Sequence, residues 1–190
     1  MADSPPKTAT PSTASTTSTP RRRIPLSQRK LDLLFVAFFL INIGFITYIV
    51  DIEQLIIPDP AHFVYPLWPP APLVDLIHWW GHTYDPLLIA RPVWWKMTIW
   101  IDALGFGPFY AVAIYAYLTG RDWIRLPSII WASVMLTNVA IILSEEFSGP
   151  HATPHPIIVL LANLPWLLLP VAVIARMARR AHPFTEPLPG

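Results

Sequence analysis

Four long apolar stretches constrain the fold of this chain more than any other feature of its sequence. Each is long enough to cross a bilayer as a helix. Only 13% of the residues are charged and 54% are apolar, a balance unlike that of a soluble domain. The sequence therefore predicts an all-α, polytopic membrane protein, a four-transmembrane-helix bundle whose spans cover about residues 31–50, 93–118, 123–143 and 156–177.

The segments outside the spans differ in composition from one another. Residues 1–28 are rich in Ser, Thr and Pro, so we expect a disordered cytosolic tail. Residues 29–180 would form the membrane domain, and residues 181–190 a second cytosolic tail. Between spans one and two, prolines alternate with aromatic residues, and we expect a short interfacial helix over about residues 72–84. Short connections make the last three spans antiparallel neighbours.

The charges are distributed unevenly between the two ends of the predicted bundle. With both termini in the cytosol, only Arg91 and Lys96 among the basic residues fall on the far side, as the positive-inside rule requires. The net charge of +1 does not provide the strongly basic surface that nucleic-acid binding favours. The lack of cysteine excludes thiolate catalysis. The far side is acidic and collects Asp51, Glu53, Asp59, Asp75, Asp85, Glu145 and Glu146.

The second span contains a carboxyl group about nine residues after its start, roughly 13 Å deep at about 1.5 Å per residue. An ionisable group at this depth normally faces the interior of the bundle or a cavity, so Asp102 is a candidate site residue. Gly105 and Gly107 follow it, together with Pro108, which removes a backbone donor. We therefore predict an interrupted helix beside a pocket.

Polar residues of the four spans fall at a similar depth. Asn42, Asp102, Asn138 and Asn163 all lie within roughly 9 to 14 Å of the far surface at about 1.5 Å per residue. Amides also join membrane helices through hydrogen bonds, and this alternative is favoured for Asn42 and Asn138. For Asp102 a ligand-filled or water-filled cavity is favoured. Trp166 lies one turn beyond Asn163, and its ring offers a face to a ligand cation.

Two histidines have a spacing that metal sites use. His78 and His82 are four residues apart, but no paired glutamate follows them in a helical motif. We interpret them as interfacial histidines and predict neither a metal nor a cofactor. Glu145 and Glu146 end the third span, and we expect both to be hydrated.

Several short motifs resemble a known family when they are taken together. Asp51 follows the first span, Asp85-Pro86-Leu87-Leu88 precedes the second, and Glu146-Phe147 ends the third. Tyr115 to Gly120 and Trp123 to Ile130 surround the turn between spans two and three. From Asp51 to about Pro170 the sequence resembles the EXPERA-domain family, most closely its sigma-2 receptor (transmembrane protein 97) branch, which includes fungal proteins named for efficient mitochondrial targeting.

This resemblance implies a four-helix bundle in the endoplasmic reticulum membrane with a cavity for sterols and cationic amphiphiles, where Asp51 and Asp85 contact the ligand. The superfamily also contains the emopamil-binding sterol isomerase, which shifts a ring double bond by protonation and deprotonation. Asn163 and Trp166 are similar to the isomerase pattern. Asn42, however, stands where that family usually has histidine, and asparagine cannot titrate.

The leading hypothesis is a non-enzymatic protein that binds a sterol-like or amphiphilic ligand and acts in lipid handling or precursor handling at the reticulum surface. Two alternatives stay open: a sterol isomerase with Asp102 as its acid, and a structural component whose pocket only holds lipid. The expected partners are the ligand and the bilayer, with membrane-protein partners and a homodimer left open. The predicted ligand-binding residues are Asp51, Asp85, Asp102, Asn42, Asn138, Asn163 and Trp166.

Overall fold

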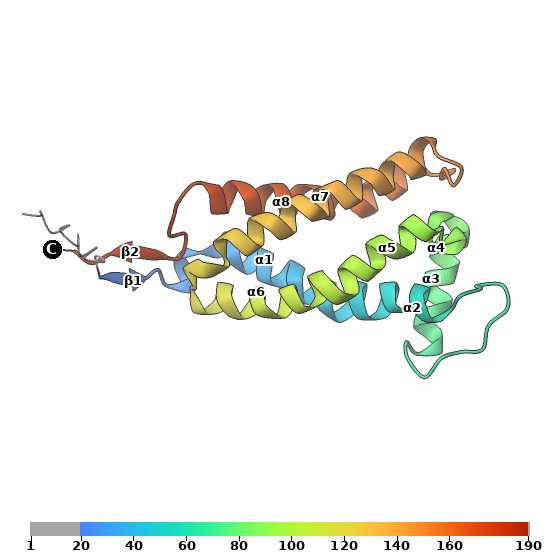
Figure 1. Ribbon diagram of the computed structural model, residues 1–190, viewed down its shortest axis with the longest axis horizontal. Helices are drawn as coiled ribbons and strands as arrows, with labels where there is room; N and C mark the ends of the chain where they lie inside the picture. Colours follow the sequence, from blue (N-terminus) through green and yellow to red (C-terminus); the bar gives the residue numbers. More distant parts are fainter. Residues whose placement is uncertain (1–19, 190) are drawn as a thin grey trace, which may run out of the picture.

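The computed structural model describes residues 20–189 and contains four helical segments that are long and apolar enough to cross a membrane. Figure 1 shows them side by side along the long axis of the molecule, with a short two-stranded ribbon at one end. The predicted all-α, four-helix membrane fold is confirmed. The four segments cover Lys30–Ile56, Val93–Thr119, Asp122–Ser148 and Pro156–Ala178.

The first two spans each contain a π-helical stretch. In span one it covers Asn42–Asp51, between α1 (Lys30–Ile41) and α2 (Ile52–Ile56). In span two it covers Asp102–Phe106, between α5 (Val93–Ile101) and α6 (Gly107–Thr119). The interruption predicted beside Asp102 is therefore confirmed, whereas the one in span one was not anticipated.

The last two spans are continuous helices. A 3-10 turn (Asp122–Ile124) leads into α7 (Arg125–Ser148), and α8 (Pro156–Ala178) continues through two internal prolines. α7 packs along α8, and α1 packs along α6. The bundle thus consists of two helix pairs, and aromatic side chains fill the core between them in the half nearer the termini, where Phe39 contacts Tyr110, Tyr117 and Trp131.

Two short helices lie at the end of the bundle away from the termini. α3 (Ala71–Thr83) runs across the bundle axis in Figure 1 and matches the predicted interfacial helix; α4 (Leu87–Ala90) leads into span two. Span one was predicted to end at Val50, but it continues through α2. Its last turn contains Glu53 and Gln54, which are both completely buried. These polar residues remain helical because other parts of the chain provide their partners.

The end of the bundle that carries both termini is tied together. β1 (Arg21–Arg23) pairs antiparallel with β2 (Thr185–Pro187), and a 3-10 turn (Leu26–Gln28) follows β1. This order corrects the prediction that the N-terminal tail is disordered to residue 28; residues 1–19 lie outside the described part. The ribbon is anchored because Phe184 is completely buried, with the Arg29 guanidinium 5.0 Å from its ring centre.

Candidate ligand-binding cavity

A cavity of about 430 Å³ lies between the helix pairs toward the α3 end of the bundle. This volume falls within the range of roughly 300–1,000 Å³ that is usual for small-molecule sites. All four spans and α3 contribute to its mainly apolar wall. Its polar lining consists of Asp51, Gln54, Asp85, Thr98, Asp102, Asn138 and Asn163.

Asp102 and Asp51 form one acidic part of the wall. Asp102 begins the π-helical stretch of span two, is 9% exposed, and accepts a hydrogen bond from the Thr47 hydroxyl of span one. Asp51 is less buried and lies close enough to Asp102 for the two charges to interact. No lysine, arginine or histidine within residues 20–189 pairs with either carboxyl. This part of the wall therefore favours a cation or a proton.

Asp85 forms a second acidic part of the wall, and Glu146 is a buried acid near it that does not itself line the cavity. Asp85 lies between α3 and α4, is 6% exposed, and accepts a hydrogen bond of 3.2 Å from the Leu87 amide. Burial raises the pKa of Asp85 above its ordinary value of 3.8. Glu146 of α7 is only 1% exposed, which corrects the expectation that it is hydrated.

The Glu146 carboxyl has no hydrogen-bond partner among the described residues, and the Asp85 carboxyl lies close enough for the two charges to interact. Two carboxyl groups can form a hydrogen bond only when one of them is protonated. The backbone holds them together, because the Thr153 amide donates to the Glu146 carbonyl at 2.7 Å and the Thr153 hydroxyl donates to the Tyr84 carbonyl. A proton on either carboxyl would remove the repulsion between the two charges.

The amides of the predicted polar layer have different roles. Asn138 and Asn163 line the cavity, and so does Trp166. Asn42 does not line it. Asn42 is completely buried, accepts a hydrogen bond of 2.8 Å from the Trp166 indole, and donates one to the Phe38 carbonyl. Asn42 thus orients an aromatic wall residue, which agrees with the amide-bridge alternative considered for it.

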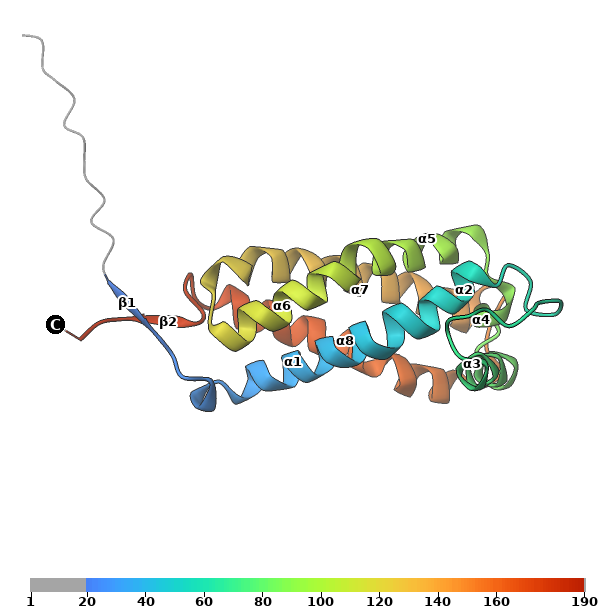
Figure 2. The same ribbon diagram turned by 90° about the horizontal axis from the view of Figure 1, so that it is seen from below.

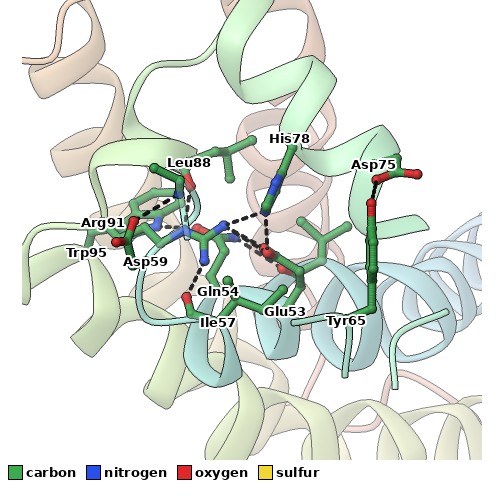
Figure 3. Close-up of polar contacts among 12 residues, drawn as sticks. Glu53, Gln54, Ile57, Asp59, Tyr65, Asp75, His78, Leu88, Arg91 and Trp95 are labelled. Carbon is green, nitrogen blue, oxygen red and sulfur yellow. Dashed lines mark hydrogen bonds and ion pairs between the residues drawn. The ribbon is translucent and has the colours of Figure 1, made fainter. Parts of the chain in front are cut away.

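A buried ion pair beside the cavity was not predicted from the sequence. Figure 3 shows Arg91 facing Glu53, with distances of 2.9 and 2.8 Å from its Nη2 to the two carboxylate oxygens. Arg91 also donates to the carbonyls of Ile57 and Leu88 at 2.6 and 2.7 Å. His78 places its Nε2 2.8 Å from Glu53 Oε1, so this histidine faces a carboxylate of span one.

The next residue of span one, Gln54, lies in the cavity wall. Gln54 Oε1 accepts a hydrogen bond of 2.6 Å from the Trp95 indole, and both residues line the cavity. Two sequence signals point to the cluster. Arg91 is the only Lys or Arg between residues 31 and 95, and Gln54 is three residues from Asp51, on the same helical face.

Comparison with known proteins identifies the family. The model of the EXPERA family, the expanded EBP superfamily, matches residues 72–177, which is more than half of the chain. The chain belongs to the EXPERA family. It is 28% identical to sigma intracellular receptor 2 of Macaca fascicularis over 173 residues, which cover 84% of this chain and 93% of the relative.

Two further relatives have the same name and similar coverage. The relative from Xenopus tropicalis is 28% identical over 160 residues, 78% of this chain and 88% of the relative. The human relative is 28% identical over 172 residues, 83% of this chain and 93% of the relative. The family resemblance that the sequence motifs indicated is confirmed, and this EXPERA protein is a multi-pass membrane protein.

Proposed function

We propose that this EXPERA protein binds a sterol-like or cationic amphiphilic ligand in the cavity inside its helix bundle. The observation that carries the proposal is the wall itself, in which Asp51, Asp85 and Asp102 border an otherwise largely apolar space. A carboxylate in such surroundings attracts an organic cation, and the aromatic faces and apolar walls favour its hydrophobic body. The relatives named sigma intracellular receptor 2 support a receptor-like role.

The setting proposed for this activity is the endoplasmic reticulum membrane, with both termini in the cytosol. The ligand-bound protein would act in sterol and lipid handling, or in precursor handling at the reticulum surface. The basic residues at the ribbon end of the bundle support this orientation, since Arg21 to Arg23 and Arg179 to Arg180 are exposed there.

Photolabelling of the purified protein tests the cavity. We expect a photoreactive cationic amphiphile and a photoreactive neutral sterol to label the wild-type chain, each in competition with its unlabelled parent. In Asp51→Asn and Asp102→Asn variants, labelling by the cation should fall by about tenfold, which corresponds to losing about 1.4 kcal/mol of charge pairing. Labelling by the neutral sterol should change less.

Asp75→Asn is the matched control, because Asp75 is exposed on α3 and does not line the cavity. Cation labelling that stays unchanged in both cavity variants would remove the acid-lined site. If only the sterol probe labels the protein, and none of the three substitutions changes that labelling, the cavity would be a pocket that only holds lipid.

A second candidate, a sterol isomerase, is favoured by one observation: Asp102 and Trp166 line the same cavity. Such an enzyme adds a proton at one ring carbon and removes another proton elsewhere, so Asp102 would need to perform both steps or share them with another carboxyl of the wall. The Trp166 indole is bonded to Asn42, which cannot exchange a proton in this range. Growth of an isomerase-deficient cell on this chain, abolished by Asp102→Asn, would establish the enzyme in place of the binding protein.

A further inference from the structure

The loop between α2 and α3 exposes an unusual run of large apolar side chains. Leu67 is 101% exposed and Val64 is 91% exposed, while Tyr65 and Trp68 are about half exposed. Leu67 and Val64 are therefore not covered by any described part of the chain. Contiguous apolar side chains of this kind mark a surface that contacts a partner or a membrane.

The apolar part of the loop returns toward the bundle and does not extend into solvent. The Trp68 indole donates a hydrogen bond of 2.6 Å to the carbonyl of Tyr48, which lies in the π-helical stretch of span one. Tyr48 precedes the end of α2 at Ile56 by eight residues, about two turns or roughly 12 Å of helix. In both ribbon views the part of the loop that leads into α3 lies level with α2 along the bundle axis (Figures 1 and 2). Trp68 is thus at a depth where span one is apolar.

The same loop separates its polar residues from its apolar ones. Asp59 accepts a hydrogen bond of 2.9 Å from the Ala61 amide and lies 3.1 Å from His62, and both of these side chains are well exposed. Tyr65 joins the two parts, since its hydroxyl donates to Asp75 of α3 at 2.6 Å (Figure 3). Aromatic side chains with one polar end are typical of the boundary between lipid and water.

We infer that this loop inserts Val64, Leu67 and Trp68 into the lipid leaflet on the α3 side of the bundle, while Asp59 and His62 stay in water. The partner is the apolar part of a phospholipid leaflet. The indole bond to Tyr48 holds the loop at this depth, and it also satisfies a backbone carbonyl of a π-helical segment that faces lipid. The loop and α3 would then act as an interfacial anchor beside the cavity.

The chain contains no cysteine, so a single introduced thiol reports on one position. We would place Leu67→Cys, Val64→Cys and His62→Cys separately in nanodiscs of phosphatidylcholine with one chain per disc. A membrane-impermeant maleimide should react at Leu67→Cys and Val64→Cys about tenfold or more slowly than at His62→Cys, because an apolar environment suppresses the reactive thiolate. An environment-sensitive fluorophore at residue 67, and not at residue 62, should be quenched by spin-labelled lipid.

His62→Cys is the matched control, because it lies in the same loop and is similarly exposed in the structure. Circular dichroism and melting temperatures equal to the wild type would show that the variants fold. Equal maleimide rates at positions 62, 64 and 67, without quenching by lipid, would overturn the proposal. Protection that occurs only when a disc holds two chains would overturn it as well, in favour of a contact between copies.

Discussion

Buried acids are accommodated in two different ways in this molecule. Glu53 is neutralised by Arg91, because one guanidinium nitrogen of Arg91 donates to both oxygens of the Glu53 carboxylate. Asp85 lies near Glu146, and Asp102 accepts a hydrogen bond from the Thr47 hydroxyl; within residues 20–189 no basic side chain forms an ion pair with either aspartate. The neutralised acid is thus part of the packed bundle, whereas Asp85 and Asp102, which line the cavity, are available to a ligand.

The first prediction concerns the buried ion pair. Arg91→Met should lower the free energy of unfolding by about 3–5 kcal/mol, because it leaves the Glu53 carboxylate buried with only His78 beside it. The Glu53→Gln/Arg91→Met double variant should recover part of this loss, since no unpaired charge remains. Unfolding in detergent, followed by circular dichroism, measures both. A double variant as unstable as Arg91→Met would contradict this assignment.

The second prediction concerns the pH dependence of stability. Asp85 ionises near pH 4 when unfolded but at a higher pH when folded, because burial raises its pKa. The folded state therefore holds more protons above about pH 4, and the free energy of unfolding should fall as the pH rises from about 4 through the raised pKa of Asp85. In Asp85→Asn this decline should be shallower, as measured by melting temperatures in detergent across this range.

Asp75→Asn provides the comparison for this experiment, because Asp75 is also acidic and on the same side of the bundle but exposed. The wild-type slope should persist in this variant. If Asp85→Asn and Asp75→Asn show the same slope, the Asp85 carboxyl is not the source of the pH dependence.

At the scale of elements, the two π-helical stretches lie against each other and shape the cavity wall. Thr47 in the first bonds to Asp102 at the start of the second. Gly107, just after the second stretch, allows this close approach, because a Cβ atom there would lie 2.5 Å from the Tyr48 hydroxyl oxygen and 3.1 Å from Thr47 Cγ2. The close contact between spans one and two thus depends on glycine, which has no side chain, at position 107.

The third prediction follows from this contact. Gly107→Ala should destabilise the protein by about 1–3 kcal/mol through overpacking, and should weaken ligand binding by displacing Thr47 from Asp102. Gly105→Ala is a strict control, because a Cβ at that position meets nothing within 4 Å. It should be neutral or stabilising by about 0.5–1 kcal/mol, since alanine favours a helix over glycine. Melting temperatures and cation photolabelling that are equal in the two variants would contradict the role of Gly107.

Hydropathy located the four spans to within a few residues at most ends, but it failed where tertiary partners neutralise charge. The charge of Glu53 places it outside span one by hydropathy, because its partner Arg91 is 38 residues away in the sequence. The depth of Asn42 did not give the direction of its side chain, which bonds to the Trp166 indole and the Phe38 carbonyl and does not line the cavity. Composition could not reveal the β1–β2 ribbon, which depends on a buried Phe184.

At the scale of the whole molecule, the ribbon places both ends of the described chain on one side of the bundle. The loop that contains His62 lies at the opposite end, as Figures 1 and 2 show. The exposed arginines of the ribbon side favour the cytosolic face of a membrane. The arrangement therefore makes the orientation measurable with one thiol at each end.

The last prediction tests this orientation in microsomes from the endoplasmic reticulum. With Leu188→Cys, a membrane-impermeant maleimide should label intact vesicles, because residue 188 follows β2 and is 48% exposed. With His62→Cys, labelling should appear only after detergent opens the vesicles, with a difference of about tenfold or more if the bilayer excludes the reagent. The cysteine-free parent chain sets the background. Labelling of His62→Cys in intact vesicles, with Leu188→Cys protected, would reverse the orientation and place the acidic end of the cavity toward the cytosol.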